Sequence, residues 1–188
     1  GDRAGDPAAD FRDEPAGALM RPPPMKSLDP GSAAIAAHPG WMRGLGLRAG
    51  WGWLADPRFG LALLAGGAFW LALVWWGQPP PLPGLAALAS LILLQPVLEE
   101  LLFRGLLQGR LRASAWGRRQ FGGFTLANMI VTLLFTALHF INHPPLWAAG
   151  VLLPSLLYGY FRDRHDSVYP AIALHVFYNA GYFLLRLL

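Results

Sequence analysis

The apolar residues of this chain are gathered into long runs instead of alternating with polar ones. Asp, Glu, Lys and Arg are absent from residues 59–98, 120–161 and 167–185. Runs of about 18 or more apolar residues are typical of membrane-crossing helices. The pattern predicts five spans and therefore an all-α, polytopic transmembrane helix bundle, with spans at 59–76, 84–108, 124–141, 147–161 and 169–187. The fourth span is short and contains Pro154, so we expect it to be tilted or broken.

The first fifty residues differ from the rest of the chain. Residues 1–40 are rich in Pro, Gly, Ala and Asp and show no apolar periodicity, which is typical of disorder. Residues 41–57 mix Trp with Arg, as a segment at the lipid headgroups does. We therefore expect a disordered or interfacial segment over 1–50 and a membrane domain over 51–188. Gly1 is not an initiator Met and no short apolar core follows a basic start, so the visible N-terminus is not expected to be a signal peptide.

Composition and charge support a membrane protein. Hydrophobic residues make up 54% of the chain and charged residues 14%, against about 25% charged residues in soluble domains. Cysteine is absent, which excludes disulfides and thiol chemistry. A nucleic-acid partner is not expected, because an RNA-binding protein would not place its aromatic residues in apolar spans.

Arginine is distributed unevenly among the connections between the predicted spans. The connection 109–123 contains four Arg and no acid, whereas 77–83 and 142–146 contain no Lys or Arg. By the positive-inside rule, the N-terminus and the Arg-bearing connections 109–123 and 162–168 are expected to be cytoplasmic. This predicts a multi-pass protein of an inner (plasma) membrane.

Three charged residues interrupt the second predicted span. Glu100 and Arg104 are four residues apart, so they share a helix face and can pair. Glu99 is turned about 100° from Glu100 and lacks that partner, which suits a general base. A structural charge pair at the end of a span would explain Glu100 and Arg104 but not Glu99. Pro96 removes a helix hydrogen bond just before Glu99, so local distortion of the helix is expected.

Two further spans contain polar residues with the same spacing. His139 follows Phe135 by four residues, and Asn179 follows His175 by four. A single His could simply bond a neighbouring helix, but polar residues on three spans are expected to turn inward and line one polar cavity. Glu99, with His139, could then activate water while His175 and Asn179 stabilise an oxyanion, which is sufficient for amide hydrolysis.

Other intramembrane protease chemistries do not fit the sequence. No His is followed by Glu, so an HExxH zinc motif is absent, and the only lysine is Lys26, so a Ser–Lys dyad within the membrane cannot form. No Asp lies in any predicted span, which excludes an aspartyl dyad, and no Ser has Gly-x-Ser-x-Gly flanks.

Three short motifs together resemble one known family. "EELLFR" (99–104) fits EExxxR, "FTALH" (135–139) fits FxxxH and "HVFYN" (175–179) fits HxxxN. In that order on separate spans they resemble the CPBP family of CAAX-processing and bacteriocin-processing intramembrane endopeptidases, also called the Abi or type II CAAX protease family. The resemblance covers roughly residues 85–182.

This resemblance implies a set of roles. Glu99 would activate water with help from His139, His175 and Asn179 would hold the oxyanion, and Glu100 with Arg104 would support the site. A glutamate-dependent reaction without a metal is favoured; the alternative is a zinc ion held by Glu99, His139 and His175. The implied substrate is a membrane-embedded or lipid-anchored protein or peptide in a bacterial membrane, cut at a CAAX-type tail, a bacteriocin leader or a C-terminal sorting tail.

Two other functions remain open. A non-catalytic protein for bacteriocin immunity or partner binding could keep the fold, and a small transporter could use the same polar residues as an ion site. One expectation from straight helices fits poorly: His139 would lie roughly 10 Å deeper than Glu99 and His175. His143, one turn later and before Pro144, is expected to be a loop residue.

Overall fold

The computed structural model describes residues 1, 40–76 and 82–184, so most of the predicted segment 1–50 lies outside the described residues. Two short helices, α2 (Gly40–Leu45) and η1 (Gly52–Ala55), precede the long helix α3 (Pro57–Trp76). A second long helix follows and runs without interruption through α4, η2, α5, η3 and α6, which are Leu85–Ala89, Ser90–Leu94, Gln95–Glu100, Leu101–Gln108 and Gly109–Arg112. The strands β1 (Gln120–Phe121) and β2 (Phe124–Thr125) lead to the last four helices, α7 (Leu126–His139), α8 (Pro145–Gly150), α9 (Leu152–His165) and α10 (Tyr169–Leu184).

Each predicted span corresponds to helix in the structure. Two helices, Pro57–Trp75 and Leu85–Arg112, are long and apolar enough to cross a membrane, and α7 is a shorter apolar helix. The total of five spans therefore stays a prediction. The fourth span is broken as expected, between α8 and α9. Pro154 has no N–H for the carbonyl of Gly150, the residue at which α8 ends.

The outward-facing side chains of the long helices are apolar. Only 17% and 11% of the most hydrophobic windows of the two long helices are buried, whereas the core helix of a soluble protein is mostly buried. On α3, Leu64 is 71% and Trp75 84% exposed. A surface of this kind suits lipid and would be unfavourable in water.

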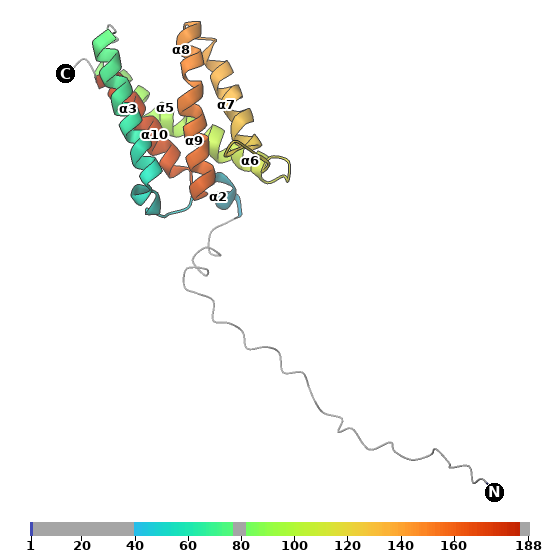
Figure 1. The fold of residues 1–188 in the computed structure, drawn as a ribbon. Helices are drawn as coiled ribbons and strands as arrows, with labels where there is room; N and C mark the ends of the chain where they lie inside the picture. The colour runs from blue at the N-terminus through green and yellow to red at the C-terminus, as the bar shows by residue number, and fades with distance from the viewer. Residues whose placement is uncertain (2–39, 77–81, 185–188) are drawn as a thin grey trace. The chain divides into compact units, whose positions relative to one another are not determined.

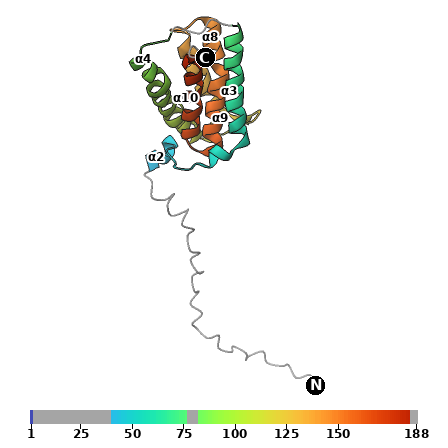
Figure 2. The ribbon, with the colours of Figure 1, turned by 90° about the vertical axis from the view of Figure 1, so that its left-hand side faces the viewer.

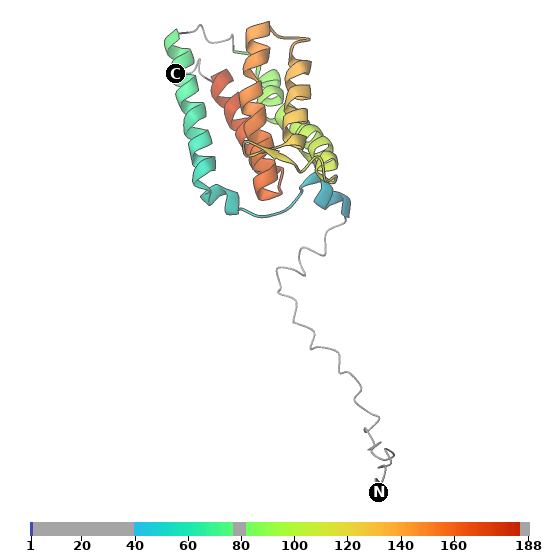
Figure 3. The ribbon, with the colours of Figure 1, turned by 45° about the vertical axis from the view of Figure 1, so that its right-hand side comes forward.

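The helices pack in a fixed order that brings distant segments together. Helix α9 lies between α7 and α10, and α10 also packs on α3 and on the η2–α5 segment. Figure 1 and Figure 2 show α3, α9 and α10 side by side, and Figure 3 shows α10 inclined relative to α9. The main cluster of buried apolar side chains, which includes Phe59, Phe161 and Leu174, joins α3, α9 and α10.

The second long helix is π-helical over Ser90–Leu94 and Leu101–Gln108. In the first of these stretches the N–H of Gln95 bonds the carbonyl of Ser90, five residues back. Such wide turns accommodate a proline, and Pro96 follows directly. The distortion expected near Pro96 is confirmed, although its extent through Gln108 was not predicted.

A small β-hairpin is an addition to the predicted all-α fold. Gln120 pairs with Thr125 and Phe121 with Phe124, around Gly122 and Gly123 at φ 57° and 89°. A two-residue turn with positive φ at both positions matches the twist of a hairpin and favours glycine. Thr125 then caps α7 by accepting the Asn128 N–H.

Close contact between α3 and α10 depends on glycine. A Cβ at Gly181 would overlap the Trp70 ring, and one at Gly66 would overlap Tyr178. Small residues at such contacts let membrane helices approach closely.

We expect Gly181→Ala to destabilise the protein by about 1–3 kcal/mol through overpacking. The measurement is the unfolding free energy in neutral detergent. Gly67→Ala is the matched control, because no atom lies within 4 Å of its added Cβ. Equal stability of the two variants would contradict tight packing at Gly181.

The link between η1 and α9 is ionic. Asp56 accepts from Arg164 Nε, lies 3.0 Å from His165 Nε2 and also accepts the Arg58 N–H. The hydrogen bond from Arg164 holds the pKa of Asp56 below its usual value. A carboxylate whose pKa is lowered in the folded state contributes stability above its unfolded pKa, and this contribution is lost as the pH falls through the folded pKa.

We therefore expect the wild type to lose more stability than Asp56→Asn when the pH falls from about 5 to about 3. Thermal unfolding of both proteins at matched pH values measures the difference. Parallel pH dependences would show that the Asp56 contacts contribute nothing.

Candidate active site

A buried charged cluster joins the second long helix to α10. Glu100 and Arg104 are fully buried, and Arg104 Nη1 lies 3.0 Å from Glu100 Oε1. The same oxygen lies 2.8 Å from His175 Nδ1 on α10. The other oxygen, Oε2, is buried without a hydrogen-bond partner among the described residues. The predicted i, i+4 pair is present, and its acid also binds a residue from another motif.

The guanidinium of Arg104 is enclosed by α7 and α9. Its Nη2 donates to the carbonyl of Ser155 at 2.9 Å and to the hydroxyl at 2.7 Å. Its Cζ lies 4.7 Å from the centre of the Phe135 ring and 5.2 Å from that of Tyr158. Hydrogen bonds and aromatic faces together compensate for the burial of a cation.

Tyr158 and Ser155 were not predicted as site residues. The Tyr158 ring stacks on the His175 ring at 4.8 Å and 18°, so one side chain supports both His175 and Arg104. The available signal was the spacing of Ser155, Tyr158 and Arg162, which places three buried side chains on one face of α9. Ser, Tyr and Arg at this spacing matched no motif.

Glu99 lies at the edge of this cluster. Its side chain is 33% exposed, and its Oε2 is 3.7 Å from His175 Nε2. Glu99 makes no ion pair with Arg104 among the residues that the structure describes, as the helical phase predicts. The imidazole of His175 therefore lies between two carboxylates, with Nδ1 on Glu100 and Nε2 toward Glu99.

His139 is the last residue of α7, and its Nδ1 lies 2.8 Å from the Phe135 carbonyl. Because a carbonyl only accepts, Nδ1 carries the hydrogen and Nε2 of a neutral ring has the lone pair. The Phe135 ring is 4.5 Å from the His139 ring and 6.1 Å from that of His175. Both histidines therefore contact one aromatic ring, whereas the 10 Å difference in depth expected from straight helices stays a prediction.

The Asn179 side chain is held by a backbone carbonyl to which neither Gln95 nor Pro96 of the second long helix donates. Its Nδ2 donates to the Leu91 carbonyl at 2.9 Å. Gln95, four residues after Leu91, donates to Ser90 instead, and Pro96, five residues after it, has no N–H. The Leu91 carbonyl thus orients the Asn179 amide, whose second N–H has no acceptor among the residues that the structure describes.

His143, a predicted loop residue, is exposed in the turn after α7, where its ring stacks on His139 at 5.6 Å. No three His, Cys, Asp or Glu side chains among the described residues are close enough together to hold a metal ion. Glu99, His139 and His175 therefore do not form a zinc ligand set in this arrangement.

A comparison with protein families found a match over residues 80–181, to the model described as Rce1-like, type II CAAX prenyl endopeptidase Rce1-like. This segment contains every motif residue described above. Neither the comparison with curated proteins nor that with solved structures found a match.

Proposed function

Because the chain belongs to the Rce1-like family of type II CAAX prenyl endopeptidases, we propose that it is an intramembrane endopeptidase whose base is Glu99. Membership supports a membrane protein with peptidase activity on a membrane-associated peptide substrate. Its cleavage site lies in a CAAX-type tail, a bacteriocin leader or a C-terminal sorting tail. The observation that carries the proposal is the position of His175 between Glu99 and Glu100.

Hydrolysis begins with a water molecule between Glu99 and the scissile carbonyl. Glu99 accepts one proton of this water, assisted by the unprotonated Nε2 of His139, and the oxygen attacks the carbonyl carbon. The proton is then transferred to the leaving amine, and the C–N bond breaks. The partial exposure of Glu99 allows water and an extended peptide to reach it.

The oxyanion is stabilised by two donors on α10. Asn179 offers the N–H that Leu91 leaves free. His175 donates through Nε2, and because Nδ1 already donates to Glu100, this requires the doubly protonated ring. The buried carboxylate of Glu100 stabilises that cation, and Arg104 holds the same carboxylate in place from its other side. Glu100 and Arg104 are thus positioning residues, and their contacts support an electrostatic role.

We expect Asn179→Ala to lower kcat by about 10²–10³-fold with little change in KM, since the lost donor acts on the transition state. The assay measures cleavage of a membrane-anchored reporter with a C-terminal tail by the protein reconstituted in vesicles. Asn142→Ala, in the exposed turn after α7, is the matched control and keeps wild-type kcat.

The same variant separates the alternative functions. A transporter that uses these residues as an ion site retains flux in Asn179→Ala vesicles, and a non-catalytic binding protein cleaves no reporter even as wild type. Undiminished cleavage by Asn179→Ala would remove Asn179 from the oxyanion site.

A further inference from the structure

The connection from the end of α6 through β1, residues 110–121, exposes both arginines and aromatic rings. Trp116 is 43% and Phe121 53% exposed. Arg110, Arg118 and Arg119 in the same segment are exposed as well. The proposed peptidase reaction uses none of these five side chains.

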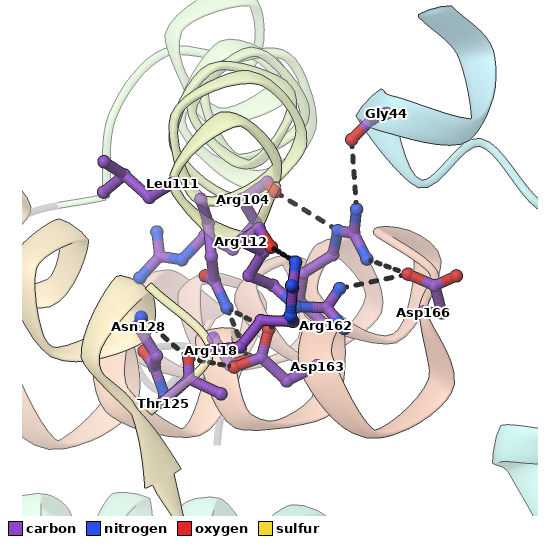
Figure 4. Close-up of polar contacts among 12 residues, drawn as sticks. Gly44, Arg104, Leu111, Arg112, Arg118, Thr125, Asn128, Arg162, Asp163 and Asp166 are labelled. Atoms are coloured by element: carbon purple, nitrogen blue, oxygen red, sulfur yellow. Dashed lines mark hydrogen bonds and ion pairs between the residues drawn. The ribbon is translucent and has the colours of Figure 1, made fainter. Parts of the chain in front are cut away.

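The nearby acids are already neutralised by other residues. Asp163 binds Arg112 at 2.9 Å and accepts from Gln108 and Thr125. Asp166 is shared among three arginines, namely Arg48, Arg112 and Arg162. In Figure 4, dashed lines join Asp166 to arginine side chains and Asp163 to its polar neighbours.

The charges of the exposed arginines are not neutralised by acids among the described residues. Within the described ranges, Arg110 and Arg119 have no acid within ion-pair distance. Arg118 donates to the carbonyls of Arg112 and Ala113 and forms no ion pair with an acid in the described part of the chain. This connection therefore presents a net positive charge to its surroundings.

The position of this connection at the end of a long apolar helix indicates what surrounds it. It includes Arg112, the last residue of the helix Leu85–Arg112, which is long and apolar enough to cross a membrane. The end of such a helix lies at the boundary between lipid and water. Exposed tryptophans and cations are both favourable at that boundary. A soluble phosphate would neutralise the arginines but leave Trp116 and Phe121 uncovered, whereas a lipid leaflet accommodates both.

We propose that Arg110, Arg118 and Arg119, with Trp116 and Phe121, form a binding surface for the headgroups of anionic phospholipids. The surface selects lipids around the protein and stands independently of the peptidase reaction. Each arginine near an anionic membrane contributes about 1 kcal/mol, or roughly fivefold in lipid association.

The test measures the association of spin-labelled phosphatidylglycerol relative to phosphatidylcholine with the reconstituted full chain. The wild type is expected to prefer phosphatidylglycerol. In the variant Arg110→Gln/Arg119→Gln, the association of phosphatidylglycerol relative to phosphatidylcholine is expected to fall roughly 30-fold, because two contributions of about fivefold are removed. Arg110→Lys/Arg119→Lys keeps the charges and most of the preference. Arg118 is left unchanged because it bonds the end of α6.

Several outcomes would overturn the proposal. These are no preference in the wild type, an unchanged preference in the Gln variant, or complete competition by soluble glycerol phosphate at concentrations matching the lipid. Reporter cleavage measured in phosphatidylcholine alone separates this result from the peptidase proposal, since the Gln variant should cleave there like the wild type.

Discussion

Glu99→Gln is expected to lower kcat by about 10²–10⁴-fold, the range for removing a general base. The amide has nearly the same shape as the carboxylate but cannot accept a proton from water. Glu99 is partly exposed, and its closest charged partner is His175 at 3.7 Å, so the fold should tolerate the change. The measurements are kcat on the membrane-anchored reporter and the termini of membrane-associated proteins in cells that express either form.

Two controls make this result specific. The melting temperature of Glu99→Gln should equal that of the wild type, which separates lost chemistry from lost folding. Glu99→Asp keeps a carboxylate at a shorter reach and should retain more activity than the amide. If Glu99→Gln keeps more than about a tenth of wild-type kcat, Glu99 is not the base.

Arg104→Met is expected to destabilise the fold by about 3–5 kcal/mol, because it leaves a buried carboxylate without its cation. Glu100 Oε2 already lacks a hydrogen-bond partner among the described residues, so His175 would be the remaining contact of the carboxylate. Chemical unfolding in neutral detergent gives the free energy. Arg110→Met replaces an exposed arginine and should stay within about 0.5 kcal/mol of wild type.

The double variant Glu100→Gln/Arg104→Met distinguishes a buried pair from two independent contacts. With both charges removed, neither is left uncompensated, so most of the loss should be recovered. Turnover should nevertheless stay low in the double variant, since His175 then lacks the carboxylate that stabilises its charged ring. Additive losses of stability would contradict coupling between Glu100 and Arg104.

The sequence predicted the helices because apolar runs identify membrane-facing segments independently of tertiary contacts. The Glu100–Arg104 pair was equally predictable, since residues four apart remain close even where the helix widens into π turns. The link from Glu100 to His175 was not, because it depends on how α10 is inclined against α5. Sequence spacing carries no information about that angle.

The other features of the structure that were not predicted from the sequence have similar causes. Ser155 and Tyr158 act through a backbone carbonyl, a hydroxyl and a ring face, which many residue types could offer. The hairpin at Gly122–Gly123 contains only two paired positions on each side, too few for a strand pattern. The depth of His139 relative to Glu99 depends on helix tilt, which a rise per residue along straight helices does not include.

Pro96 and Asn179 are structurally coupled across two helices. Pro96 withholds an N–H from the Leu91 carbonyl, and Asn179 supplies the missing hydrogen. The two residues should therefore be inherited together among relatives. A lineage that loses the proline would regain a backbone bond and release the amide, whereas one that loses the amide would leave a bare carbonyl in the membrane interior.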